Sequence, residues 1–479
     1  MINQICIKIS EVILSVLALE TEIKDNVICH PQKYYGSIHR LLSGVLGVVA
    51  HHNLNYKPTS GVADVFQNLE ASLSLDCFFI QNFKKSSKNE QDALNQFLVW
   101  LEAKNFDSIK LSDLYELMLS LEFPIKDGAI VEDYEGEILD TIGSFYTPKD
   151  LADKCVELTL DNYILQNTGI EQFSIADKNQ PQTQQVAELL KKSTYADNSC
   201  GTGSFILAIL RYVDEHFSSH SDEIKKTIVL NFEAIEADSL ALEIAKIEVL
   251  SKINRIDLYS EVSSNFIHGN PILGPTQTNS SFAYSDDFYY HNGLAIDPAN
   301  LKNSDVILGN PPWGEVGFDL AYFCRVILPK MNEVKSQDDL ERVLGGLETS
   351  HPYLFDWLLE HEEANDLAVD EIYEDKRFQN STNGGLHTNV LFTELCDSLS
   401  TENGSVGLVL KGSTLSDSQN KRLLNLLSDR NRIQGRFDFL NTLQVFNIDK
   451  DEEFSILILG SNNSGELVRK TGLTQLAEV

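Results

Sequence analysis

The spacing of apolar side chains in the first 130 residues predicts a succession of helices. Apolar residues recur there at intervals of three and four positions, as on one face of an α-helix. The clearest patterns run over 5–19, 35–49, 93–104 and 111–121. Ser112 and Asp113 are candidate caps at the start of the last pattern. This part of the chain is therefore expected to be mainly helical.

Beyond the helical part, short apolar runs alternate with helical patterns. Strands are expected at 194–196, 231–238, 265–271 and 305–309. Helices are expected at 151–160, from the glycines near 203 to about 212, and at 239–253. Strands that alternate with helices form a parallel sheet, whose binding site lies at the carboxyl ends of the strands. The pattern thus predicts an α/β fold behind a helical N-terminal part.

Three further stretches stand out by their composition. Residues 178–185 are rich in Gln and Asn and predict a surface loop, and the aromatic and acidic stretch 282–290 predicts a mobile one. Residues 332–378 are strongly acidic and predict a helical insert over one side of the binding site, with a face that repels phosphate backbones. Within this insert, Trp357 shares a helical pattern with leucines and is expected in the core.

The composition predicts a globular protein of a reducing compartment. Of the 479 residues, 42% are hydrophobic and 23% are charged. The seven cysteines are scattered without a Cys-x-x-Cys pair, which argues against a disulfide framework and against a zinc site. The apolar opening segment contains Lys8 and Glu11 and lacks both a basic leader and a cleavage site. It therefore predicts an amphipathic helix, and we expect a cytoplasmic protein without a membrane span.

The charge balance restricts the expected partners. With 38 Lys and Arg against 71 Asp and Glu, the formal net charge is −33, and a surface of that average sign repels phosphate backbones. If nucleic acid is the substrate, a local basic groove, a missing domain or a basic partner must supply the attraction. The alternative is that the acidity serves only solubility.

The segment 305–313 carries the most distinctive candidate chemistry. An apolar run ends at Gly309 and is followed by Asn310, Pro311, Pro312 and Trp313. The prolines have no backbone donors, so carbonyl acceptors are in excess beside the amide oxygen and a flat aromatic ring. Such a corner suits a planar substrate that carries an amino group. The alternative is an ordinary turn after a strand, with a tryptophan on the surface.

A glycine-containing loop precedes this segment. It runs from Asp197 to Phe205, and its Gly201 and Gly203 allow a tight turn that brings backbone close to a ligand at a helix N-terminus. The spacing matches neither the dinucleotide fingerprint nor the P-loop, and what remains suits a nucleoside ligand without phosphates. The alternative is a glycine turn with only a structural role. Glu236 follows at the interval expected for a carboxylate that binds ribose hydroxyls. Asp238 is an alternative helix cap.

Two other motifs are expected to carry no chemistry. The Glu-x-Lys spacing of Glu102 and Lys104 occurs in metal-dependent nucleases, but there it lies on a strand, and here it follows a helical pattern. We therefore expect a solvated helix face and no nuclease. His51 and His52 are interpreted as part of a loop and not as metal ligands. No metal site is predicted.

In order and spacing, these motifs resemble the S-adenosylmethionine-dependent, adenine-specific DNA methyltransferases of the gamma class. The resemblance is greatest to enzymes of fused restriction-modification and anti-phage modification systems. It begins near Leu114, Tyr115 and Glu116 and continues to about Gly460. Its later parts are a helix at 388–396 and strands at 404–410, 437–446 and 454–460.

The resemblance implies a Rossmann-like methyltransferase sheet preceded by an all-helical N-terminal domain. The helical domain would span 1–135, and the methyltransferase domain would span 136–465 with the acidic helical insert at about 331–385. Residues 466–479 would be a tail or the start of a missing segment. The family's target-recognition domain is not visible, so recognition would belong to another polypeptide or to a missing part, and further partner subunits of a defence system are expected.

The resemblance also assigns roles to individual residues. The cofactor would be S-adenosylmethionine, and Glu236 would hold its ribose. Asn270 stands where many relatives have an Asp that contacts the cofactor's adenine, and Asn198 stands where relatives often have Pro. The other implied cofactor-binding residues are Tyr146, Thr147, Pro148, Asp197, Cys200, Gly201, Gly203 and Phe205. In catalysis, Asn310 and Pro311 would accept the two N–H bonds of a flipped adenine taken from double-stranded DNA, and Trp313 would stack on that base.

Two alternative functions remain open at this point. The Asn-Pro-Pro-aromatic corner also occurs in enzymes that methylate protein glutamine or amino groups of RNA, and both substrates would relieve the charge problem. The other alternative is a non-catalytic subunit that binds the cofactor to regulate a defence complex.

Overall fold

The computed structural model describes most of the chain, with gaps. The described residues are 2–54, 59–104, 106, 108–133, 147–174, 180–217, 221–273, 295–316, 324–446, 450–461 and 468–479. Tyr146, the predicted loop 282–290 and the expected domain boundaries near 135 and 465 lie outside them.

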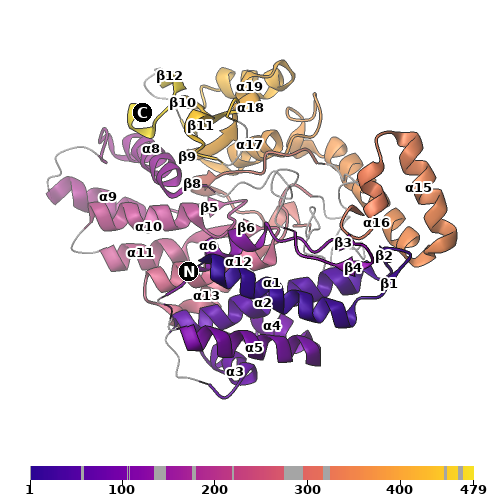
Figure 1. Cartoon of the computed structure of the whole chain (residues 1–479). Helices are drawn as coiled ribbons and strands as arrows, with labels where there is room; N and C mark the ends of the chain where they lie inside the picture. The colour runs from indigo at the N-terminus through magenta and orange to yellow at the C-terminus, as the bar shows by residue number, and fades with distance from the viewer. Residues whose placement is uncertain are drawn as a thin grey trace.

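An eight-stranded sheet forms the centre of the protein (Figure 1). Its strand order is β12-β10-β11-β9-β8-β5-β6-β7. The strands are β5 (Tyr195–Asp197), β6 (Phe232–Glu236), β7 (Phe266–His268), β8 (Ser304–Gly309), β9 (Ser400–Lys411), β10 (Ile433–Leu440), β11 (Glu453–Leu459) and β12 (Val468–Leu473). Strand β11 is antiparallel to β9 and β10, and the other pairs are parallel.

The strand order reverses between β5 and β8. From β5 the chain continues outward through β6 and β7, and it then returns to the other side of β5 as β8 and continues to β9. Tyr195 and Ala196 of β5 pair with Val306 and Ile307 of β8. A reversal of this kind leaves a crevice at the carboxyl ends of the two strands, where ligands of doubly wound sheets bind. The predicted Rossmann-like α/β fold is thus confirmed, and it places 197–205 beside 310–313.

Helices cover both faces of the sheet because buried parallel strands are apolar on both sides. In β8, Val306 and Leu308 belong to the core on one face and Ile307 to the core on the other. The helices that follow in sequence are α8 (Lys149–Thr168), α9 (Gln180–Lys192), α10 (Ser204–His216), α11 (Ser221–Leu230), α12 (Ser239–Lys252), α13 (Tyr259–Ser263), α17 (Thr388–Leu399), α18 (Gly412–Ser416) and α19 (Lys421–Asp429). Short 3₁₀ segments are η1 (Ile256–Leu258), η4 (Pro298–Asn300), η5 (Pro329–Glu333), η6 (Lys376–Phe378), η7 (Ser418–Asn420), η8 (Asn441–Leu443) and η9 (Leu476–Glu478).

The predicted N-terminal helices form a layer next to α12 (Figure 1). They are α1 (Ile2–Glu20), α2 (Pro31–Asn53), α3 (Val62–Ser72), α4 (Phe78–Lys85), α5 (Lys88–Lys104) and α6 (Leu111–Met118). Two small hairpins pair β1 (Ile23–Lys24) with β2 (Val27–Ile28) and β3 (Ile125–Lys126) with β4 (Ala129–Ile130). By length and composition alone, α1 is apolar enough to cross a membrane. Its Ile5, Ile9 and Ile13 are fully buried in the core of this layer.

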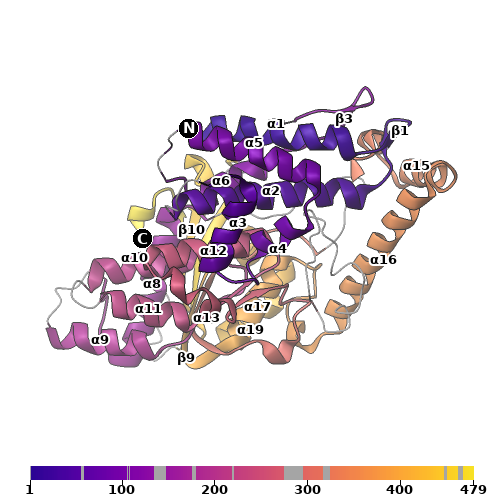
Figure 2. The same ribbon diagram turned by 90° about the horizontal axis from the view of Figure 1, so that it is seen from below.

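The acidic insert is helical, as predicted. It contains α15 (Gln337–Ser350) and α16 (Pro352–Glu374), which lie on the side of the molecule opposite α9 (Figures 1 and 2). Trp357 is 2% exposed and stacks on Tyr35 of α2 with ring centroids 6.4 Å apart, so its expected place in the core is confirmed. Farther along α16, Ala368 and Ile372 join a separate core with α17. Helix α16 therefore bridges the N-terminal layer and the sheet domain.

Two local predictions are wrong, and one is confirmed. The predicted loop 178–185 is helical from Gln180 onward, because Pro181 suits the first turn of a helix and the glutamines are good helix formers. His51 and His52 lie in the last turn of α2 and not in a loop, and their rings contact Asn68 and the carbonyl oxygen of Phe106, respectively. The segment 102–104 is an exposed helix end, as expected.

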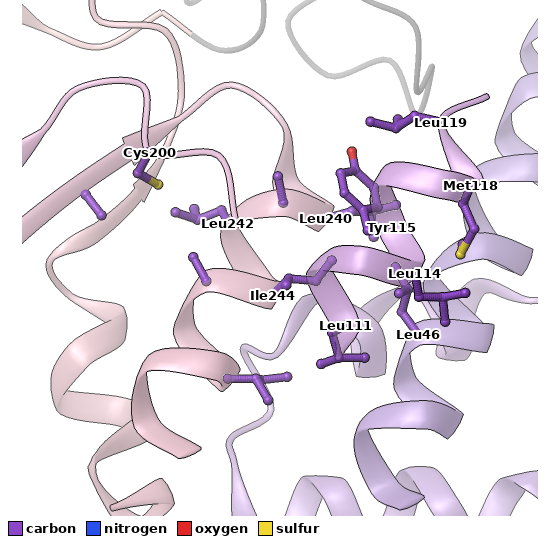
Figure 3. Close-up of a cluster of buried hydrophobic side chains, with 14 of the residues drawn as sticks. Leu46, Leu111, Leu114, Tyr115, Met118, Leu119, Cys200, Leu240, Leu242 and Ile244 are labelled. Atoms are coloured by element: carbon purple, nitrogen blue, oxygen red, sulfur yellow. The ribbon is translucent and has the colours of Figure 1, made fainter. Parts of the chain in front are cut away.

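The N-terminal layer and the sheet domain share one continuous apolar core. Figure 3 shows Leu111, Leu114 and Met118 of α6 next to Leu240 and Ile244 of α12. Polar contacts accompany this packing. Three carboxylates at the start of α12 or along it accept hydrogen bonds from the layer: Asp238 from the Tyr115 hydroxyl, Glu243 from the Phe78 N–H at 3.2 Å, and Glu248 from the Ser112 N–H at 2.9 Å.

We expect Tyr115→Phe to lower the free energy of unfolding by about 1–3 kcal/mol, because the half-buried Asp238 carboxylate loses a donor. Urea denaturation measures the change. Tyr353→Phe is the matched control, since that ring is 46% exposed and its hydroxyl donates to Gln32 at the surface; its effect should stay within about 0.5 kcal/mol. An equally small effect of both substitutions would contradict a structural role of the Tyr115 hydroxyl.

Candidate functional site

The Glu236 carboxylate holds the glycine loop in place at the end of β6. One of its oxygens accepts the Gly201 N–H at 2.7 Å, and the other accepts the Asp238 N–H at 3.0 Å. The Cys200 N–H also donates to the carbonyl oxygen of Ile235 at 2.9 Å. The loop after β5 is therefore joined to the carboxyl end of β6 by two hydrogen bonds, and the third ties Glu236 to the start of α12.

The two predicted glycines adopt backbone conformations that favour glycine. Gly201 has φ 52° and Gly203 has φ 89°, both in the left-handed region that glycine occupies without strain. A Cβ added to Gly203 would lie 3.2 Å from the Cβ of Ala245 on α12. Gly203 thus allows α10 to begin close to α12, while the loop backbone stays near the ends of β5 and β6.

Asp197 ends β5 and faces the end of β8. Its Oδ1 accepts the Ser199 N–H at 3.1 Å, and the side chain is 1% exposed. A Cβ added to Gly309 would lie 3.1 Å from the same oxygen, a tight contact that the glycine avoids. The predicted cofactor loop and the predicted catalytic segment therefore meet at Asp197 and Gly309.

The acceptor corner after β8 is held by Thr388 at the start of α17. The Thr388 hydroxyl contacts the carbonyl oxygens of Pro312 at 2.6 Å and of Gly314 at 2.8 Å, and the Thr388 N–H donates to the latter at 3.0 Å. Among the described residues, none donates to the carbonyl oxygen of Pro311. Toward the described residues, this carbonyl therefore keeps its acceptor capacity.

Trp313 lies inside the protein and contacts Asn310. The indole Nε1–H donates to Asn310 Oδ1 at 2.9 Å. The Trp313 side chain is 7% exposed, and its ring meets that of Phe446 edge-on with centroids 4.8 Å apart. The ring of Phe446 packs in turn on that of Phe454 in β11. The alternative of a tryptophan on the surface is therefore wrong.

The side chains of the other predicted residues make none of these contacts. Cys200 and Phe205 are 5% and 2% exposed and belong to the core. Thr147 is 9% exposed and precedes α8, where Pro148 is the N-cap residue. The Oδ1 atom of Asn270 accepts the N–H of Ile272 at 3.2 Å within its own turn. Asp238 caps α12, as the alternative interpretation expected, with its Oδ1 accepting the N–H groups of Leu240 and Ala241.

Three residues near the site were missed as contributors. Thr388 fixes the acceptor corner, Tyr115 donates to Asp238, and the Asn198 amide donates to Cys396 Sγ at 3.6 Å. Asn198 is 3% exposed, and its Oδ1 accepts no hydrogen bond from the described residues. The two residues of each contact lie far apart in the sequence, so a local sequence pattern cannot predict these contacts.

The two carboxyl groups of the site have altered acidity. Burial raises the pKa of Asp197 to about 8 and the pKa of Glu236 to about 7. The negative charge of Glu236 adds to the increase at Asp197, and the backbone N–H groups that each carboxylate accepts oppose the increase. A bound cation or a set of donors would favour the ionised forms of both. In the described part of the chain, no cluster of His, Cys, Asp and Glu side chains is suited to a metal ion.

Comparisons with known proteins give structural similarity without close relatives. No protein-family model matches the chain, and no curated protein matches it. Among solved structures, the chain is similar to a protein of Listeria monocytogenes assigned to the class I S-adenosylmethionine-dependent methyltransferases, with 11% identity, coverage of 99% of this chain and 94% of that one, and a TM-score of 0.40.

A protein–DNA complex and a subunit of a restriction enzyme are similar as well. The DrdV–DNA complex has 13% identity over 98% of this chain with a TM-score of 0.48, and this chain covers 42% of DrdV. A modification subunit of a type I restriction system from Vibrio vulnificus has 13% identity over 98% of this chain and 84% of that one, with a TM-score of 0.42. The chain thus spans less than half the length of DrdV. Likeness at this level leaves the function to be argued from the site.

We expect the pH dependence of stability to reveal the buried carboxyl group of Asp197. Its folded-state pKa, about 8, lies above the unfolded value near 4. The stability that it contributes is therefore complete below about pH 4 and is lost as the pH rises through about 8. Between pH 6 and pH 8, the natural protein should lose on the order of 2 kcal/mol of its free energy of unfolding through this group, and Asp197→Asn should not show this loss.

Urea unfolding at the two pH values measures this difference. Asp150→Asn is the control, because that carboxylate on α8 is 85% exposed, and it should leave the pH dependence of the natural protein unchanged. An unchanged pH dependence in Asp197→Asn would show that Asp197 is ionised throughout this range.

Proposed function

We propose that this protein is a methyltransferase that transfers a methyl group from S-adenosylmethionine to the exocyclic amino group of adenine in DNA, within a restriction-modification or phage-defence system. The observation that carries the proposal is the meeting of two motifs at the point where the strand order reverses. There the loop 197–203, held by Glu236, lies beside the acceptor corner that follows Gly309. Under this proposal, a nucleoside site and an amino-group site are adjacent.

The residues of the loop fit S-adenosylmethionine. The Glu236 carboxylate accepts one N–H group at each oxygen and retains further acceptor positions for the two ribose hydroxyls. The left-handed glycines keep side chains out of the turn, and Asp197 is a carboxylate that can balance a cationic ligand. When bound, the cofactor supplies an electrophilic methyl group on a sulfonium. Phosphates are not needed, in agreement with a loop that has no phosphate-binding motif.

The acceptor corner fits a neutral aromatic amine. The carbonyl oxygen of Pro311 and the Oδ1 atom of Asn310 are placed on one short segment and can accept the two N–H bonds of an amino group. These bonds strengthen as positive charge develops on the nitrogen during its attack, so they favour the transition state over the ground state. With the cofactor bound, the methyl group would pass directly from its sulfur to the nitrogen, and one amino proton would then leave to water. No covalent enzyme intermediate is required.

DNA as the substrate requires help from elsewhere, because a net charge of −33 opposes the approach of a polyanion. We therefore propose that a separate recognition polypeptide or domain, with partner subunits of the same system, delivers the duplex and the flipped base. The test is to sequence DNA from cells with and without the gene and its neighbours by a method that detects N6-methyladenine. Mass spectrometry of protein and RNA from the same cells separates the alternatives: methylated glutamine or methylated RNA without methylated DNA would reject the proposal.

We expect Asn310→Ala to lower the methylation rate by about 10²-fold or more, because a preorganised acceptor at the developing charge is lost. Transfer of labelled methyl groups measures the rate. Calorimetric titration with the product S-adenosylhomocysteine is the accompanying measurement, and its Kd should change by less than about twofold. A rate near that of the natural protein would remove Asn310 from the mechanism.

For Glu236→Ala, in contrast to Asn310→Ala, we expect the main effect on the binding of S-adenosylhomocysteine. Loss of the carboxylate should weaken S-adenosylhomocysteine binding by about 10- to 100-fold, because charge-assisted hydrogen bonds contribute about 1.5–3 kcal/mol. Glu236→Gln keeps one acceptor oxygen and should lie between the two. Tight binding by Glu236→Ala in the calorimeter would place the ribose elsewhere.

A further inference from the structure

The Trp313 side chain points to a role that differs from stacking on the target base. We propose that Trp313 is a positioning residue, which fixes the orientation of the Asn310 amide through its indole N–H. This inference rests on the proposed function and concerns how the same site is organised. It starts from the burial of the ring and from the hydrogen bond between the two side chains.

The ring of Trp313 is engaged by the protein. It is 7% exposed and packs edge-on against Phe446, with an interplanar angle of 64°. Phe446 packs on Phe454, which stacks on Phe439 with centroids 5.0 Å apart. This chain of aromatic contacts anchors Trp313 to β10 and β11. A stacking platform for a base needs an open aromatic face, and so deeply buried a ring offers little.

The indole N–H distinguishes the two orientations of the Asn310 amide. An indole nitrogen only donates hydrogen bonds, whereas an amide has an accepting oxygen at one end and a donating nitrogen at the other. With Oδ1 toward Trp313, the 2.9 Å hydrogen bond forms. After a flip of the amide, two donors would face each other and the bond would be lost. Trp313 therefore selects the orientation in which the Asn310 oxygen occupies the corner.

This orientation is the one that the proposed chemistry needs. An amide oxygen has two acceptor positions, so Oδ1 can accept from Trp313 and from a substrate amino group. Beside it, Thr388 takes the carbonyl oxygens of Pro312 and Gly314 and leaves that of Pro311 to the substrate. Trp313 and Thr388 thus organise the two acceptors of this segment.

The first test is Trp313→Phe, which removes the N–H and keeps an aromatic ring. We expect kcat to fall about fivefold to tenfold, the value of one hydrogen bond, while KM for DNA and the Kd of S-adenosylhomocysteine change by less than about twofold. Trp100→Phe, on α5 in the N-terminal layer, is the control and should leave all three unchanged. A stacking role predicts the reverse for Trp313→Phe, an unchanged kcat or a change confined to KM, and either result would overturn the proposal.

The second test asks whether orientation is what matters. In Asn310→Asp the two carboxylate oxygens are equivalent, so a flip changes nothing. Adding Trp313→Phe to Asn310→Asp should therefore lower kcat by less than about twofold beyond the single variant. The same five- to tenfold loss in both backgrounds would mean that Trp313 acts independently of the Asn310 amide.

The third test needs no activity. The chain has three tryptophans, and their indole N–H signals in an NMR spectrum of the uniformly labelled protein are assigned with the Phe variants. We expect the Trp313 signal to exchange slowly with water and to shift, with faster exchange, in Asn310→Ala. An unaffected signal would overturn the hydrogen bond and the proposal with it. A shifted signal in a protein that methylates no DNA would instead reject the proposed function alone.

Discussion

The carboxylate of Glu236 is the contact on which the geometry of the site depends. It joins the N–H of Gly201 to one oxygen and the N–H of Asp238 to the other, so that it fixes both the glycine loop and the start of α12. Gly201 lies in the connection between β5 and α10, and Asp238 lies in the connection between β6 and α12. The carboxylate therefore holds two separate connections together. The fixed loop carries Asp197 against Gly309 and thereby brings the acceptor corner to the same crevice. The site is thus preorganised by a residue that also has acceptor capacity left for a ligand.

The N-terminal layer takes part in this arrangement through α12. Asp238, which caps α12 beside Glu236, accepts from Tyr115 in α6. Farther along the helix, Glu243 and Glu248 accept backbone donors from the layer. Buried carboxylates without donors would be costly, so the layer and the sheet domain stabilise each other. Helix α12 contacts the glycine loop at its start and the N-terminal layer along its side. The layer therefore supports the position of the glycine loop through α12.

Most of the fold follows from local sequence patterns, and the finer parts of the site do not. The strands β5 to β8 and their helices were predictable because each has its own apolar period, and the glycine loop and Glu236 because their spacing along the chain is fixed by the βαβ unit. The start of α9 was mistaken for a loop because glutamines and a proline suit both. The direction of the Trp313 ring could not be predicted, because the sequence of residues 310–313 is compatible with both an exposed and a buried rotamer. Its burial depends on Phe446, more than a hundred positions later. The domain boundaries near residues 135 and 465 lie outside the described residues and remain predictions.

The distribution of charge separates the chemistry of the proposed site from the binding of its substrate. An adenine amino group is neutral, so Asn310 and Pro311 need no positive field to accept from it. The phosphates of a duplex do need one, and many of the guanidinium groups in the described part of the chain are already paired with carboxylates. The paired arginines are Arg40, Arg211, Arg255, Arg325, Arg342, Arg377, Arg432 and Arg436. Binding to a phosphate is less favourable for a guanidinium that must first separate from a carboxylate than for an unpaired guanidinium. Under the proposed function, the chain therefore contributes the methyl-transfer site, and the basic surface that holds the duplex belongs to its partner.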